Sequence, residues 1–172
     1  MRLVLDLFLI GCLLVIVIQD FKHRAISWYV LPIILLGFIF KSYFSNGFQE
    51  LLKFSAFNIS FIIVQIVFLT TYMSIKNKKI TNIIDSYIGL GDVLFFVVMC
   101  LAFSPANFIV FYISSITFTL VGFLIYKQIV KNASVEIPLA GAQALAMIVL
   151  LVMSNFTQLN FYSDDYLLSR IA

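Results

Sequence analysis

The chain has 172 residues, of which 63% are hydrophobic and only 11% are charged, and its formal net charge is +3. So few polar residues cannot cover a soluble core, which excludes a soluble globular protein, and the length suits one compact domain. The basic residues are scattered and form no stripe, so we expect no nucleic-acid binding. The composition therefore predicts a polytopic protein of the lipid bilayer, of the all-α class.

Six apolar runs approach the length of about 20 residues that crosses a bilayer as a helix. They lie at about residues 3–19, 27–44, 51–73, 89–103, 107–126 and 137–153. The fourth and sixth runs are short, which suggests that they begin in partly wet space lined by protein. We therefore expect one bundle of about six transmembrane helices over residues 1–153, followed by a tail, residues 154–172, at the outer membrane interface.

The basic residues in short loops indicate which side of the membrane faces the cytoplasm. The opposite side and the chain ends carry four Lys or Arg residues, whereas the loops after the first, third and fifth runs carry seven. This bias predicts a multi-pass protein of the cytoplasmic membrane with both termini outside. The seven residues on the predicted cytoplasmic side are Lys22, Arg24, Lys76, Lys78, Lys79, Lys127 and Lys131.

Two carboxylates lie where the apolar runs should meet water. Asp20 closes the first run, and Asp92 opens the fourth. A charged side chain costs about 2.5–3.5 kcal/mol at the membrane centre on insertion scales, so an acid in such a place usually has a partner or a function. The predicted topology puts both acids at the same depth, near the cytoplasmic face.

A pair of acids at one depth suits the chemistry of an aspartic protease. Two carboxyl groups about 3 Å apart cannot both ionise easily, so they share one proton. The ionised member can then activate a water molecule, while the protonated member polarises a peptide carbonyl. Because Gly89 and Gly91 lack side chains, the chain can bend before Asp92 and let a substrate backbone approach it.

The run Gly89-Leu90-Gly91-Asp92 matches the GxGD motif of intramembrane aspartyl proteases, and its surroundings resemble the type IV prepilin peptidases and their archaeal preflagellin relatives. Asp20 is followed by a short basic segment, as in the first catalytic motif of that family, and the last run begins with a proline, Pro138. The resemblance covers about residues 13–153. One departure is that Ser27 follows Ile26, where family members commonly have an Ile-Pro pair after the first Asp.

The resemblance implies a peptidase that uses Asp20 and Asp92 as its catalytic residues, with no cofactor and no metal. Its substrates would be prepilin-like precursors, of the Tad/Flp or pseudopilin type, with a short basic leader that is cut at the cytoplasmic face. The paired CxxC zinc ligands of the methyltransferase domain in larger members are missing, so we expect a stand-alone peptidase.

Other interpretations remain open for the same residues. Asp20 alone could be an interfacial helix cap, and Asp92 alone could be a structural hydrogen-bonding residue. Asp85 is expected to be a solvated loop acid, and His23 a solvated loop residue. The alternative functions are a non-catalytic scaffold, a small transporter that binds a proton or a cation, or another GxGD protease. The transporter predicts an internal repeat, which the sequence does not show.

Overall fold

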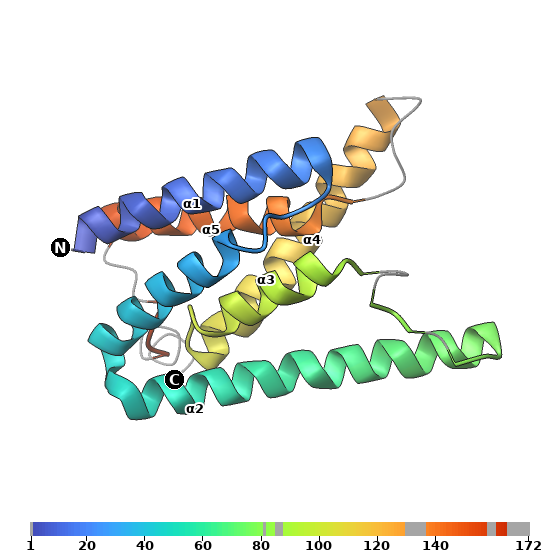
Figure 1. Cartoon of the computed structure of the whole chain (residues 1–172), viewed down its shortest axis with the longest axis horizontal. Helices are drawn as coiled ribbons and strands as arrows, with labels where there is room; N and C mark the ends of the chain where they lie inside the picture. Colours follow the sequence, from blue (N-terminus) through green and yellow to red (C-terminus); the bar gives the residue numbers. More distant parts are fainter. Residues whose placement is uncertain (1, 81, 85–87, 130–136, 158–160, 165–172) are drawn as a thin grey trace.

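The computed structural model describes residues 2–80, 82–84, 88–129, 137–157 and 161–164. These residues form five helices and no strand (Figure 1). Four of the helices, all except α3, are long and apolar enough to cross a membrane. The predicted all-helical bundle is therefore confirmed. The helices are α1 (Arg2–His23), α2 (Val30–Asn77), α3 (Leu90–Cys100), α4 (Pro105–Ile129) and α5 (Leu139–Phe156).

Helix α2 contains both the second and the third predicted run. The two runs form two arms that meet in a sharp bend at Gly47, where φ is 80° and ψ is 173° (Figure 1). Glycine adopts a positive φ without the steric cost that a side chain brings, which explains why the bend falls at this residue. The five helices thus account for all six apolar runs.

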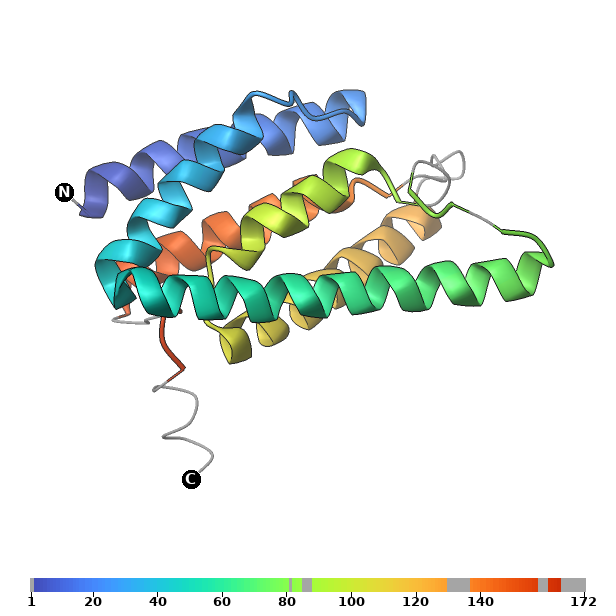
Figure 2. The ribbon, with the colours of Figure 1, turned by 60° about the horizontal axis from the view of Figure 1, so that its bottom comes forward.

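Helix α3 is too short to cross a bilayer by itself. Its 11 residues span about 16 Å at 1.5 Å per residue, about half the thickness of the hydrocarbon core. The second arm of α2, residues 48–77, reaches about 45 Å by the same rule and continues past the first residue of α3 (Figure 2). The second arm of α2 therefore extends past Asp92, which lies in the first turn of α3.

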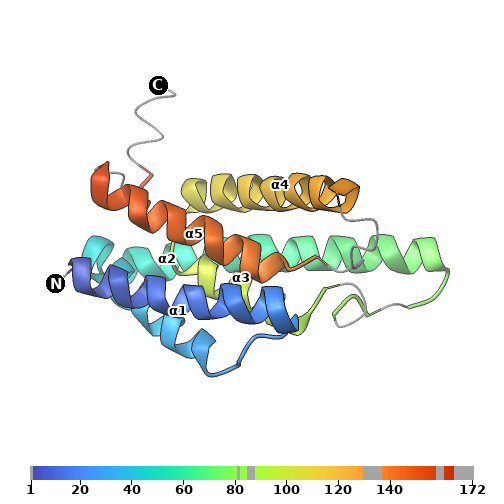
Figure 3. The same ribbon diagram turned by 90° about the horizontal axis from the view of Figure 1, so that it is seen from above.

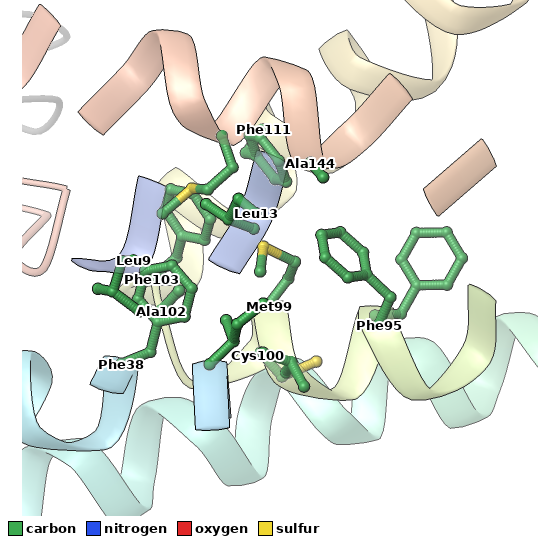
Figure 4. Packing of buried hydrophobic residues seen from close by; sticks show 14 of the residues in the cluster. Leu9, Leu13, Phe38, Phe95, Met99, Cys100, Ala102, Phe103, Phe111 and Ala144 are labelled. Carbon is green, nitrogen blue, oxygen red and sulfur yellow. The ribbon is translucent and has the colours of Figure 1, made fainter. Parts of the chain in front are cut away.

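The hydrophobic core is shared by all five helices. Helices α1 and α5 lie side by side along their length (Figure 3), and α3 packs against both α2 and α5. Large side chains from each helix meet between them (Figure 4). Burial of this cluster fixes how the ends of α1, α3 and α5 lie relative to one another. The labelled members are Leu9, Leu13, Phe38, Phe95, Met99, Cys100, Ala102, Phe103, Phe111 and Ala144.

Part of the predicted tail folds back onto the end of the bundle where α2 bends. The backbone N–H of Ser104 donates to the carbonyl of Phe161 at 3.1 Å, and the Asn46 side chain donates to the carbonyl of Tyr162. The Asp164 carboxylate accepts a bond of 3.2 Å from the backbone N–H of Ala106, in the first turn of α4. Residues 161–164 therefore tie the bend of α2 to the start of α4.

Asn58 joins the second arm of α2 to the end of α3. It is fully buried, and its Nδ2 donates to the carbonyls of Cys100 and Phe103 at 2.9 Å each. We expect Asn58→Ala to lower the free energy of unfolding by about 1–3 kcal/mol, because two buried carbonyls lose their donor. Unfolding in detergent micelles would measure the change.

Ser60→Ala is a matched control for this prediction. The Ser60 side chain is exposed and donates only to the Ala56 carbonyl of its own helix, at 2.7 Å. Its removal should change the free energy of unfolding by less than about 0.5 kcal/mol. Equal stability of the two variants would show that Asn58 does not hold α3.

Candidate active site

Asp20 lies in the last turn of α1, which ends at His23. The backbone N–H of Arg24 donates to the Asp20 carbonyl at 3.0 Å, and Arg24 adopts a left-handed conformation with φ of 51°. The following loop is held back against the helix, because the N–H of Ser27 donates to Gln19 Oε1 at 2.9 Å. Asp20 is only 6% exposed, so its carboxylate lies inside the bundle on a fixed helix end.

Asp92 lies in the first turn of α3, which Gly89 caps in an extended conformation. The N–H groups of Asp92 and Val93 donate to the Gly89 carbonyl at 3.0 and 3.2 Å. A methyl group added at Gly89 would lie 3.3 Å from Asp92 Oδ2. The missing side chain of Gly89 therefore leaves room beside the carboxylate.

Gly91 has a different neighbour. A methyl group added there would lie 3.3 Å from Cδ1 of Ile26, in the loop that follows Asp20. Gly91 thus lets the loop between α1 and α2 pack closely on the first turn of α3. This contact holds the loop that follows Asp20 against the helical turn that carries Asp92.

The first turn of α5 joins the two acids. The N–H of Ala140 donates to Asp92 Oδ1 at 3.0 Å, and the N–H of Gly141 donates to Asp20 Oδ2 at 2.6 Å. The first amides of a helix have no partner within it, and the N-cap residue, Pro138, makes no side-chain cap bond. Two acids far apart in the sequence therefore cap α5 together, through consecutive amides.

This arrangement favours paired acid–base chemistry. The positive end of a helix dipole stabilises a nearby carboxylate, so α5 offsets part of the cost of removing the buried Asp20 and the half-buried Asp92 from water. Two carboxyl groups held on consecutive amides repel each other when both are charged, which favours a state with one proton between them. One ionised and one protonated carboxyl group could act on a water molecule as general base and general acid.

Sequence reasoning singled out the two acids but missed the amides of Ala140 and Gly141. The last run begins with Pro138, which is followed by small residues, but neither feature marks a hydrogen-bond donor. A backbone donor has no side-chain signature, so its partner could not be read from the sequence. Asp85, the other acid considered, lies outside the described residues.

The part of the chain that the structure describes contains no group of three or more His, Cys, Asp or Glu side chains that could hold a metal ion. Cys12 and Cys100 are free thiols within α1 and α3. His23, the last residue of α1, is exposed, whereas Asp20 is buried and Asp92 is half-buried at this end of the bundle.

Comparison with protein-family models gives a match to the type IV leader peptidase family over residues 7–124, more than half of the chain. The matched residues include Asp20, Gly89, Gly91 and Asp92, and they end before α5. Neither the curated proteins nor the solved structures contain a match to this chain. The amides of Ala140 and Gly141 thus lie outside the matched range.

Proposed function

Because the chain belongs to the type IV leader peptidase family, we propose that it is an intramembrane aspartic endopeptidase whose catalytic residues are Asp20 and Asp92. Membership of this family indicates that the chain is a peptidase, and its apolar helices indicate an integral membrane protein. The observation that carries the proposal is the meeting of the two acids on consecutive amides of α5.

In this mechanism the two carboxyl groups carry one proton between them. The ionised group takes a proton from a water molecule, whose oxygen attacks the scissile carbonyl carbon. The protonated group donates to the carbonyl oxygen and stabilises the negative charge that develops there. The C–N bond then breaks, the amide nitrogen takes up a proton, and the products are a carboxylate and a free amine.

The substrates that we propose are prepilin-like precursors, of the Tad/Flp or pseudopilin type, with a short basic leader followed by a long apolar helix. We expect the cut at the cytoplasmic face of the cytoplasmic membrane, with both termini of the enzyme outside. The distribution of basic residues supports this orientation, because Lys22, Lys76 and Lys127 lie in the last turns of α1, α2 and α4. These helix ends lie on the same side of the bundle as the start of α3 (Figure 1).

The proposal is tested by incubating the purified protein in liposomes with a basic-leader precursor from the same genome. Mass spectrometry of the products should show one cut after the leader, and cleavage should persist in a strong chelator. Failure to cut any such precursor would overturn the substrate assignment and favour proton or cation binding by the same acids. Loss of cleavage in the chelator would contradict a dyad that works without a metal.

We expect Gly91→Val to lower the rate of cleavage by about 10–100-fold, because small displacements of reacting groups cost rates of this order. The valine Cβ would press on Ile26 and shift the loop that holds the end of α1. Gly11→Val in α1 is the matched control, since a Cβ at Gly11 meets no atom within 4 Å. Equal turnover of the two variants, at equal amounts of inserted protein, would show that Gly91 does not support the site.

A further inference from the structure

We propose that the first turn of α5 positions the two acids, with Gly141 as the positioning residue. Its backbone N–H binds the Asp20 carboxylate, and its missing side chain lets that carboxylate approach α5 beside Asp92. The inference rests on the proposed function of the two acids. It assigns a role to a helix that neither the GxGD motif nor the family match includes.

The first reason is the close approach at Gly141. This residue is buried, and its N–H donates to Asp20 Oδ2 at 2.6 Å, slightly shorter than is usual for an N–H donor. A Cβ at this position would lie 2.9 Å from Asp20 Oδ2, 3.0 Å from Asp20 Cβ and 2.9 Å from Cδ2 of Phe21. A side chain there would displace the Asp20 carboxylate and the Phe21 ring, or move α5 away from the end of α1.

The second reason is that the two bonds of α5 act on different helices. The amide of Ala140 holds Asp92 of α3, and the next amide holds Asp20 of α1. Because both donors belong to one rigid helical turn, they fix the two carboxylates relative to each other. A side chain at Gly141 would displace the Asp20 carboxylate and leave the bond to Asp92 in place, so it would change the spacing of the two acids.

The third reason is which oxygen atoms are used. Ala140 holds Asp92 through Oδ1, and Gly141 holds Asp20 through Oδ2. The Asp92 carboxylate is also hydrogen-bonded by the Gly89 backbone, and the missing side chain of Gly89 keeps a methyl group out of contact with Asp92 Oδ2. These bonds restrict how each carboxyl group can rotate, so they fix the direction in which the two acids face each other.

The test measures kcat and KM for precursor cleavage by Gly141→Ala, with Gly11→Ala and Gly122→Ala as matched controls. A Cβ at either control position meets no atom within 4 Å. For Gly141→Ala we expect kcat to fall by about 100-fold, since a misplacement of 1 Å costs about this much. KM should change by less than about 3-fold, because substrate binding in the ground state is not affected. A kcat equal to that of the two controls would overturn the inference.

The double variant Gly141→Ala with Phe21→Ala distinguishes the contact of the added methyl group with Phe21 from its contact with Asp20. If the loss came from crowding of the Phe21 ring, Phe21→Ala would restore kcat in the Gly141→Ala background. We expect kcat to stay low, because the contact with the Asp20 carboxylate remains. Recovery in the double variant would reduce Gly141 to a packing residue and overturn the inference.

If Gly141→Ala does not fold in a thermal unfolding assay, Ala140→Pro provides the second variant. Proline is tolerated in the first turn of a helix and removes the N–H that holds Asp92. A folded Ala140→Pro protein with unchanged kcat would also overturn the inference. The Asp variants distinguish this inference from the proposed function. If Asp20→Asn and Asp92→Asn are inactive while Gly141→Ala is fully active, only this inference is wrong. If the Asp variants are active, the proposed function is wrong.

Discussion

Leader cleavage is expected to fall by about 10⁴-fold when either Asp20 or Asp92 is replaced by Asn, the upper range for loss of general acid–base catalysis. An amide side chain can neither take a proton from water nor donate one as an acid. Its oxygen can still accept the bond from Gly141 or Ala140, so each variant should remain folded and inserted. Cleavage of a precursor at equal amounts of inserted protein, together with thermal unfolding, measures both parts of this prediction.

Two other acids serve as controls for the dyad. Asp85→Asn should cleave at the rate of the parent protein if Asp85 is a solvated loop acid. Asp164→Asn should also remain active, since Asp164 bonds to the start of α4, at the opposite end of the bundle from Asp20. Full cleavage by Asp20→Asn or by Asp92→Asn would remove that residue from the catalytic pair.

The second large effect is expected at a buried ion pair. Lys41 Nζ, in the first arm of α2, donates to Asp6 Oδ1 in α1, and the two side chains are only 10% and 6% exposed. The Lys41 ammonium group also lies 5.9 Å from the ring centre of Phe161 and 5.5 Å from that of Tyr162. These distances suit a cation–π interaction, so Lys41 connects α1, α2 and the C-terminal segment.

We expect Lys41→Met to lower the free energy of unfolding by about 3–5 kcal/mol, because it leaves the Asp6 carboxylate buried without its partner. Thermal or denaturant unfolding in detergent micelles would measure this loss. The exposed pair of Lys53 and Glu50 is the control, since its side chains are 67% and 42% exposed. Lys53→Met should cost less than about 1 kcal/mol.

A double variant, Asp6→Leu with Lys41→Met, distinguishes a lost ion pair from lost packing. Replacing both charges by apolar side chains of similar size is often neutral or stabilising, so most of the stability should return. A double variant as unstable as Lys41→Met alone would show that the Lys41 side chain acts through its packing on Phe161 and Tyr162.

The sequence predicted the class of fold and singled out the two acids that the structure brings to one helix end. Its apolar runs located every helix to within a few residues, because a membrane span must be long and apolar wherever it lies in the bundle. It also singled out Asp20 and Asp92, because a carboxylate next to an apolar run is costly and therefore conspicuous. The sequence indicated two separate spans at residues 27–44 and 51–73, whereas the structure joins them in α2 through the positive φ of Gly47.

Only the tertiary structure decided which groups meet. Ala140 and Gly141 carry no side-chain donor in the sequence, and Asp6 and Lys41 are charges in two separate apolar runs. Every residue except proline carries the same backbone N–H, so no residue type marks the amides that hold the acids. Which donor finds which acceptor depends on how the core aligns the ends of α1, α3 and α5. The sequence by itself thus determined the spans and the two acids, and the packing of the helices decided that the two acids share one helix end.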